Sequence, residues 1–462
     1  MATKNSVKIL EVCRVSPPQN TGSVSAIPTT LPLTFFDIIW LRFAPVQRVF
    51  FYETSHTQTP FLDTILPKLK DSLSLTLQQY LPLAGTLIWP KDSHKPIINY
   101  AEGDAILLSV AESNANFYDL SGDNFVEAVQ YHPLVPHLAT STEACSVLAL
   151  QVTTFSNCGF CIGITAHHAV LDGRSSTMFM KSWARICKLG GDALSLVPEL
   201  TPCYDRMVIK DPTGLEAIYL NQWMNENGPN NKSLMVWELK TPPDTVRGTF
   251  KLTRANLEKL RQLIMTSMQE EKKKPNSKQK QPLHLSTYTI TCAYTFVCLA
   301  KAERLGGTKY LFVFAVDARH RLEDPIPGTY FGNCVVGRTA NLEANELLGK
   351  DGTAVGVKAI SEAIRSLGDG VLSGAEKFSE LVFTGKNARI IGIAGSPRFE
   401  LYSTDFGWGK PMKVDTISID KTGAISLSET RDGAGEVEIG LVLKKPEMEV
   451  FASLFAKGLE GL

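Results

Sequence analysis

The chain has 462 residues, of which 44% are hydrophobic and 20% are charged. That length exceeds what one ordinary hydrophobic core organises, so two domains are expected. Lys plus Arg and Asp plus Glu each number 47, so the net charge is zero and gives no support for a nucleic-acid partner.

The cellular compartment is inferred from the N-terminus and the cysteines. The first residues lack the continuous apolar segment of a secretory signal, and no run reaches the roughly 18 apolar residues of a membrane span. The nine cysteines are odd in number and scattered, as expected of reduced thiols. We therefore expect a cytoplasmic protein without a membrane anchor.

Helical and strand periodicities alternate along the chain, which favours an α/β fold. Residues 61–77 place apolar side chains at helical spacing. Residues 146–155 and 159–168 are predicted to be two strands joined by a tight turn at Ser156-Asn157. Near the C-terminus, residues 437–443 alternate as a strand, and Pro446 opens a helix.

The segment 197–222 is rich in proline and has no clean periodicity. We therefore expect a first domain over 1–196, a crossover linker over 197–222 and a second domain over 223–462. A second irregular segment, 270–282, contains five lysines and almost no apolar residue, so it is predicted to be a surface loop.

The most informative segment runs from Ile164 to Gly173, where an apolar strand leads into His167 and His168. Imidazole titrates near neutral pH, so a histidine at this position could remove the proton of an alcohol. Asp172 could orient that imidazole or pair with an arginine and hold the turn, and the short connection favours the second role. A helix is predicted to follow Gly173, capped by Ser175 or Ser176. An isolated histidine pair would more often simply end a buried strand.

Other catalytic chemistries have little support. The chain has no Gly-x-Ser-x-Gly elbow, phosphate-binding loop or dinucleotide motif. Cys158 and Cys161 would face opposite sides of a strand, and no cluster has zinc-ligand spacing. We therefore predict neither a metal site nor a protein nucleophile.

Three motifs resemble those of the BAHD acyltransferases of plants. His167–Gly173 contains the HxxxDG signature, and Asp405–Gly409 is the DFGWG motif. Tyr330–Cys334 matches the YFGNC motif of the branch that acts on anthocyanins and other flavonoid glycosides. The similarity extends over essentially the whole chain and includes Leu31–Asp37.

The resemblance implies two domains of similar size, each a mixed sheet with flanking helices as in chloramphenicol acetyltransferase, with a channel between them. His168 and Asp172 would be the catalytic residues. His168 would be the general base in the channel, and Asp172 would form an ion pair with Arg319. Gly173, Asp405 and Gly407 would support the structure of the site.

The resemblance also implies the substrates. A malonyl or hydroxycinnamoyl group would pass from acyl-CoA, the co-substrate, to a sugar hydroxyl of an anthocyanin or other flavonoid glycoside, on a monomer without a permanently bound cofactor. Residues expected to contact acyl-CoA are Lys272, Lys273, Lys274, Ser286, Thr287 and Arg174, the last facing a malonyl carboxylate. Residues expected in the acceptor channel are Thr34, Phe36, Asp37, Asn333 and Trp408.

Some alternatives stay open at this point. Asn333 and the Trp408 indole are the candidates for hydrogen bonding to the reaction oxyanion. Another acyl-CoA with a non-flavonoid alcohol or amine acceptor would fit the same motifs. A carrier-dependent condensation enzyme would have no reason to contain YFGNC, and intact His168 and Asp172 argue against a non-catalytic paralogue.

Overall fold

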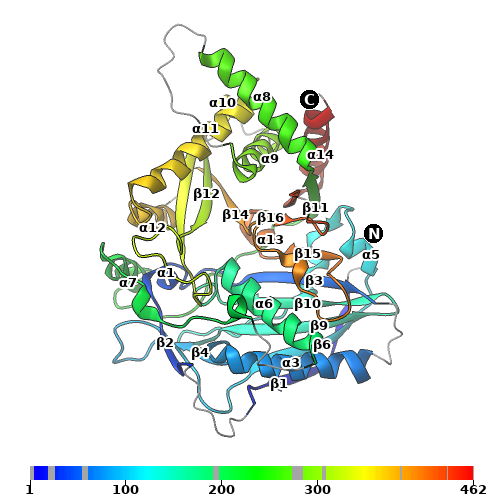
Figure 1. Cartoon of the computed structure of the whole chain (residues 1–462), viewed down its shortest axis with the longest axis vertical. Coiled ribbons are helices and arrows are strands. Elements are labelled where there is room, and N and C mark those ends of the chain that lie inside the picture. The colour runs from blue at the N-terminus through cyan, green and yellow to red at the C-terminus, as the bar shows by residue number, and fades with distance from the viewer. Residues whose placement is uncertain are drawn as a thin grey trace.

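The computed structural model describes residues 5–18, 27–54, 61–190, 197–272, 285–303, 309–384, 388–433 and 435–460. Two large mixed sheets lie one above the other along the long axis of the molecule (Figure 1). Within the described residues, none of the helices combines the length and the apolar character that crossing a membrane requires.

The first sheet carries the histidine pair. Its central strands β9 and β10 form the predicted antiparallel hairpin, with Asn157 in the turn at φ +59°. The other neighbours are antiparallel except β6 and β9. The strand order is β1 (Val7–Val15), β6 (Ile106–Ser113), β9 (Leu148–Phe155), β10 (Gly159–Ala166), β3 (Val46–Glu53) and β15 (Lys413–Thr416).

The second sheet forms the other half, and β14 pairs in parallel with both of its neighbours. Its order is β13 (Val335–Glu343), β12 (Lys309–Asp317), β14 (Arg389–Ala394), β16 (Ile425–Glu429), β17 (Val437–Lys444), β11 (Thr245–Leu252) and β7 (Val126–Glu127). A small antiparallel sheet contains β2 (Thr30–Pro32), β5 (Ile97–Asn99), β4 (Thr86–Ile88) and β8 (Ala144–Ser146).

Helices flank both large sheets. In the first half, α3 packs against α6, where the Trp183 indole donates to the Leu69 carbonyl at 3.1 Å. The helices of this half are α1 (Phe35–Ile38), α3 (Leu66–Gln79), α4 (Leu81–Ala84), α5 (Phe117–Ser121), α6 (Gly173–Lys188) and α7 (Leu215–Asn225). Those that follow are α8 (Arg254–Lys272), α9 (Thr287–Glu303), α10 (Ala344–Leu348), α11 (Gly352–Arg365), α12 (Ala375–Thr384), α13 (Ile419–Thr422) and α14 (Lys445–Glu460).

The mixed α/β fold and the elements predicted at 61–77, 146–168 and 437–446 onward are confirmed. The segment 197–222 is more ordered than its composition indicated. Helix α7 starts inside it and runs past its end, burying Leu215, Tyr219 and Trp223 on one side.

Two strand exchanges tie the halves together. Strand β15 comes late in the chain but pairs with β3 in the first sheet, and β7 comes early but pairs with β11 in the second. The boundaries at 196 and 222 stay a prediction. They divide the sequence into two parts, but β7 and β15 each belong to the sheet of the other part.

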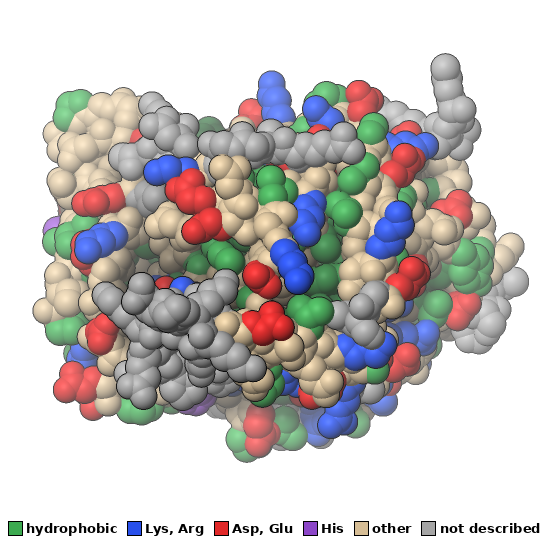
Figure 2. Space-filling model, turned by 90° about the horizontal axis from the view of Figure 1, so that it is seen from above, with side chains coloured by type: hydrophobic (Ala, Val, Ile, Leu, Met, Phe, Trp, Pro, Cys, Tyr) green, Lys and Arg blue, Asp and Glu red, His purple; other side chains and the backbone are tan. Residues whose placement is uncertain are grey.

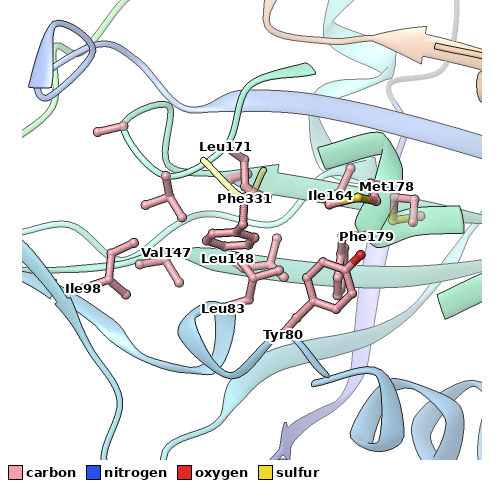
Figure 3. Packing of buried hydrophobic residues seen from close by; sticks show 14 of the residues in the cluster. Tyr80, Leu83, Ile98, Val147, Leu148, Ile164, Leu171, Met178, Phe179 and Phe331 are labelled. Atoms are coloured by element: carbon pink, nitrogen blue, oxygen red, sulfur yellow. The ribbon is translucent and has the colours of Figure 1, made fainter. Parts of the chain in front are cut away.

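One hydrophobic core contains residues from both halves. Phe331, from the YFGNC segment, is fully buried and enters the first half among Leu83, Leu148 and Leu171 (Figure 3). Its ring lies 5.0 Å from that of Tyr204. Phe331 therefore anchors the second half onto the first.

Charges on the outer surface are mixed. On the face drawn in Figure 2, basic and acidic side chains are interspersed, without a broad patch of one sign. This agrees with the zero net charge of the chain.

Candidate active site

The histidine pair lies in the connection between β10 and α6. Asp172 is the N-cap of α6, and its Oδ1 accepts the Ser175 N–H at 2.8 Å. The prediction that Ser175 or Ser176 caps this helix is therefore wrong, because Asp172 occupies the cap position with extended backbone and Ser175 supplies the N–H. A Cβ on Gly173 would lie 2.5 Å from the Phe399 ring, so that ring would have to move.

The predicted ion pair between Asp172 and Arg319 is present. Asp172 Oδ2 lies 2.8 Å from Arg319 Nη2, with both side chains almost fully buried. Asp172 also accepts the Cys334 N–H, and Arg319 donates to the carbonyl of Gly332. Burial alone would lower the pKa of Arg319, but the carboxylates of Asp172 and Asp317 raise it above the ordinary value. This pair fastens the turn of the first half to the YFGNC loop of the second.

A second set of hydrogen bonds holds the backbone of His168. Asn333 Nδ2 donates to the His168 carbonyl at 3.0 Å and to Asp37 Oδ1 at 3.1 Å. Asp37 Oδ2 in turn accepts the N–H and hydroxyl of Thr34, each at 2.9 Å. Thr34, Asp37 and Asn333, predicted in the acceptor channel, are all buried and brace the turn from behind.

His168 projects its imidazole between aromatic rings. The Trp40 indole stacks on it with centroids 4.2 Å apart and planes 9° from parallel, and Phe43 meets it edge-on at 6.1 Å. Nδ1 is buried without a partner on another described residue, whereas the side chain as a whole is only half-buried, which leaves the Nε2 edge accessible. Burial lowers the pKa of His168 to about 4, although its own carbonyl and Asp172 partly oppose the shift. The ring is therefore a neutral base at physiological pH.

His167 has a different role. It is fully buried, its Nδ1 accepts the Ala169 N–H at 3.3 Å, and burial lowers its pKa to about 3. Because Nδ1 accepts a hydrogen bond, the proton of the neutral ring is on Nε2. His167 thus shapes the turn from a fully buried position.

The DFGWG segment does not lie beside His168. Asp405 Oδ1 accepts the N–H groups of Gly407 and Gly409, and Gly407 adopts φ +106°, which glycine tolerates best. Trp408 meets the Phe160 ring edge-on at 6.2 Å. Phe160 lies near the start of β10, roughly 20 Å along the strand from its histidine end. The motif therefore supports the fold at a distance from His168.

The residues predicted to contact acyl-CoA are dispersed. Arg174 donates to the Gly328 carbonyl at 2.8 Å and lies 3.5 Å from Asp317. Ser286 caps α9, its Oγ accepting the Thr289 N–H, and Thr287 is the first residue of that helix. Lys272 ends α8, while Lys273 and Lys274 lie outside the described residues.

Trp40 and Phe43 were not identified from the sequence. They follow Phe35-Phe36 in an apolar stretch, and nothing there separates an aromatic residue beside the base from one in the core. Across the described part of the chain, no group of three or more His, Cys, Asp or Glu side chains is placed to hold a metal ion.

Comparison with known proteins gives a consistent result. Residues 6–457 match the Transferase family. Phenolic glucoside malonyltransferase 1 of Arabidopsis thaliana is 41% identical over 475 residues, covering 99% of each chain. The malonyl-CoA:anthocyanidin 5-O-glucoside-6''-O-malonyltransferase of the same plant is 43% identical over 467 residues, also covering 99% of each.

Among solved structures, vinorine synthase superposes with a TM-score of 0.69 at 19% identity, covering 97% of this chain and 98% of that one. At that identity the likeness establishes the fold alone.

The buried pair predicts a coupled loss of stability. Asp172→Asn leaves Arg319 paired with Asp317, and Arg319→Met leaves the buried Asp172 carboxylate without its cation. Each should cost up to roughly 3–5 kcal/mol, whereas the double variant should lose much less than the sum. Thermal melts measure all three. As a control, removing the exposed Lys251–Asp123 pair should cost at most about 1 kcal/mol. Additive losses for Asp172 and Arg319 would contradict the pairing.

The low pKa of His168 predicts the pH dependence of catalysis. Since the base acts unprotonated, kcat/KM should stay level from about pH 8 to about pH 5 and fall only around a pKa of about 4. Initial rates of thiol release measure this, with tryptophan fluorescence confirming at each pH that the chain is folded. An acid limb centred near the ordinary value of 6.5 would be inconsistent with a desolvated base.

Proposed function

This chain belongs to the BAHD acyltransferases, and from that premise we propose that it transfers a malonyl group from malonyl-CoA to a sugar hydroxyl of a phenolic or flavonoid glycoside, anthocyanins included. The observation that carries the proposal is the identity of 41% and 43% to two glucoside malonyltransferases along the full length of both chains. The hydroxycinnamoyl donors also expected from the YFGNC motif are the competing substrates to be tested.

The geometry supports direct transfer. The acceptor hydroxyl gives its proton to Nε2 of His168 as its oxygen attacks the thioester carbonyl. The tetrahedral intermediate then expels the CoA thiolate, which takes the proton from the imidazolium. A neutral imidazole with an accessible Nε2 suits this cycle, because no protein nucleophile or acyl-enzyme is required.

A small cavity lies beside Trp40; at about 10 Å³ it holds about one water molecule, so an acceptor ring could enter only if its walls moved apart. Trp40, which stacks on the base, forms part of its wall, as does Phe36, which was predicted in the acceptor channel. The remaining lining, from both halves, is largely apolar: Phe35, Ile39, Leu215, Tyr219, Val335, Val336, Gly337, Ala375 and Phe378. Aromatic and aliphatic walls favour a phenolic aglycone.

An open groove on the second half, with about 880 Å³ of space, supports placing the CoA phosphates there. Its lining includes Thr287, one of the residues predicted to contact acyl-CoA, and two arginines. Arg254 is exposed, and Arg261 pairs with Glu258 and donates to the Leu285 carbonyl. Guanidinium groups bind phosphate through paired hydrogen bonds. Arg174 stays a prediction for the malonyl carboxylate, which would have to displace Asp317.

We also propose that the chain works as a monomer in the cytosol. All nine of its cysteines are free thiols, as a reducing compartment favours. Light scattering of the purified protein and the distribution of a fluorescent fusion would test these two points.

A substrate panel tests the proposed function. Purified protein is offered malonyl-CoA, coumaroyl-CoA and acetyl-CoA with phenolic glucosides, anthocyanin glucosides, their aglycones and agmatine. We expect the highest kcat/KM with malonyl-CoA and a glucoside, and a product heavier by one malonyl group. His168→Ala should lose roughly 10²–10⁴-fold in kcat. A preference for coumaroyl-CoA, or equal rates with aglycones, would refute the donor or the acceptor assignment.

The groove predicts a specific defect in donor binding. Arg254→Ala combined with Arg261→Ala should raise the KM for acyl-CoA about tenfold, since charge-assisted hydrogen bonds are lost. The KM for the acceptor should not change. Arg14→Ala, in an exposed arginine of β1, is the matched control and should leave both values unaltered. An unchanged donor KM in the double variant would place the phosphates elsewhere.

A further inference from the structure

Acyl transfer creates an oxyanion, and a hydrogen-bond donor must lie beside the position it takes. The two donors expected from the sequence are not available. Both N–H bonds of the Asn333 amide are used, by Asp37 Oδ1 and the His168 carbonyl. Trp408 packs against Phe160 near the far end of β10.

Trp40 is a polar side chain in direct contact with the imidazole of the base. It is 8% exposed, and its indole Nε1 is buried with no acceptor in the described part of the chain. A buried N–H without a partner is destabilising, and a catalytic role is one of the explanations for retaining such a group. The indole also forms part of the wall of the small apolar cavity.

The parallel stacking of Trp40 on His168 restricts where the indole N–H can donate a hydrogen bond. The attacking oxygen is held at the Nε2 edge, in the plane of the imidazole. The carbonyl carbon that it attacks lies just beyond, so the carbonyl oxygen can enter the adjacent layer, which the indole occupies with its ring centroid 4.2 Å from that of the imidazole. Contacts with Phe43 and Phe378 hold the indole in that layer.

We propose that Trp40 is a second catalytic residue, whose indole N–H donates a hydrogen bond to the thioester oxygen as it becomes the oxyanion. As the hydroxyl proton passes to His168 and the new C–O bond forms, the π electrons of the carbonyl move onto this oxygen. When they return, the C–S bond breaks and the thiolate takes the proton from His168. This role rests on acyl transfer from a thioester, and not on which acyl group or acceptor is used.

The decisive variant replaces the Trp40 indole with β-(3-benzothienyl)alanine, which keeps the stacking surface and removes only the N–H. We expect kcat to fall roughly 10²–10³-fold, with both KM values within threefold and an unchanged melting temperature. Trp40→Phe should behave similarly. Rates are measured on the best substrate pair of the panel, so a wrong malonyl assignment does not affect the outcome.

The pH profile of kcat/KM and a control variant separate a catalytic role of Trp40 from a positioning role. If Trp40 merely desolvated or oriented His168, its loss would shift the acid limb of kcat/KM toward the ordinary histidine value, whereas loss of an oxyanion donor leaves the limb in place. Trp89→Phe is the matched control, because Trp89 is also buried with an unpartnered Nε1 but follows β4 and, unlike Trp40, is not stacked on His168. A benzothienyl variant with kcat within threefold of the parent, or a kcat loss accompanied by a shifted limb, would overturn the proposal.

Discussion

The buried ion pair of Asp172 and Arg319 is the interaction on which the site depends. Asp172 caps α6 in the first half, and Arg319 follows β12 in the second, so the pair forms only when the halves are docked. A buried pair of this kind contributes little net stability but makes any arrangement that separates its charges very unfavourable. It therefore selects the docked geometry, in which Asn333 also reaches the carbonyl of His168.

The chemistry of His168 follows from this docking. Asn333 holds its backbone carbonyl, and Trp40 covers one face of its ring. These contacts fix the position of the imidazole and leave its Nε2 edge for a substrate. Desolvation keeps the imidazole neutral, as a base must be at the start of the reaction, and the lowered pKa also makes it a weaker proton acceptor. Trp40 also forms part of the wall of the small apolar cavity, so the base and this cavity share one side chain.

Periodicity was sufficient to predict α3 and α14, because each buries a stripe of side chains. The β9–β10 hairpin was predicted from two apolar runs on either side of a turn, and both strands are buried at every residue. The pairing of Asp172 with Arg319 came from the motif resemblance. The helix cap was wrong because Asp172 and the two serines are all good N-caps, and spacing alone does not rank them. The exchanges of β15 and β7 depend on pairings between distant segments, which local patterns do not encode. Trp40 was missed because a stacked aromatic looks like core until the partner ring is known.

The central claim is that His168 is held as a neutral base with the lone pair on Nε2. Nitrogen-15 NMR of histidine-labelled protein, assigned by comparison with His168→Gln, measures this directly. The account predicts a neutral ring with its proton on Nδ1 near pH 7 that stays neutral on acidification until the pH approaches about 4. A ring that is protonated near pH 7, or a neutral ring with its proton on Nε2, would contradict it.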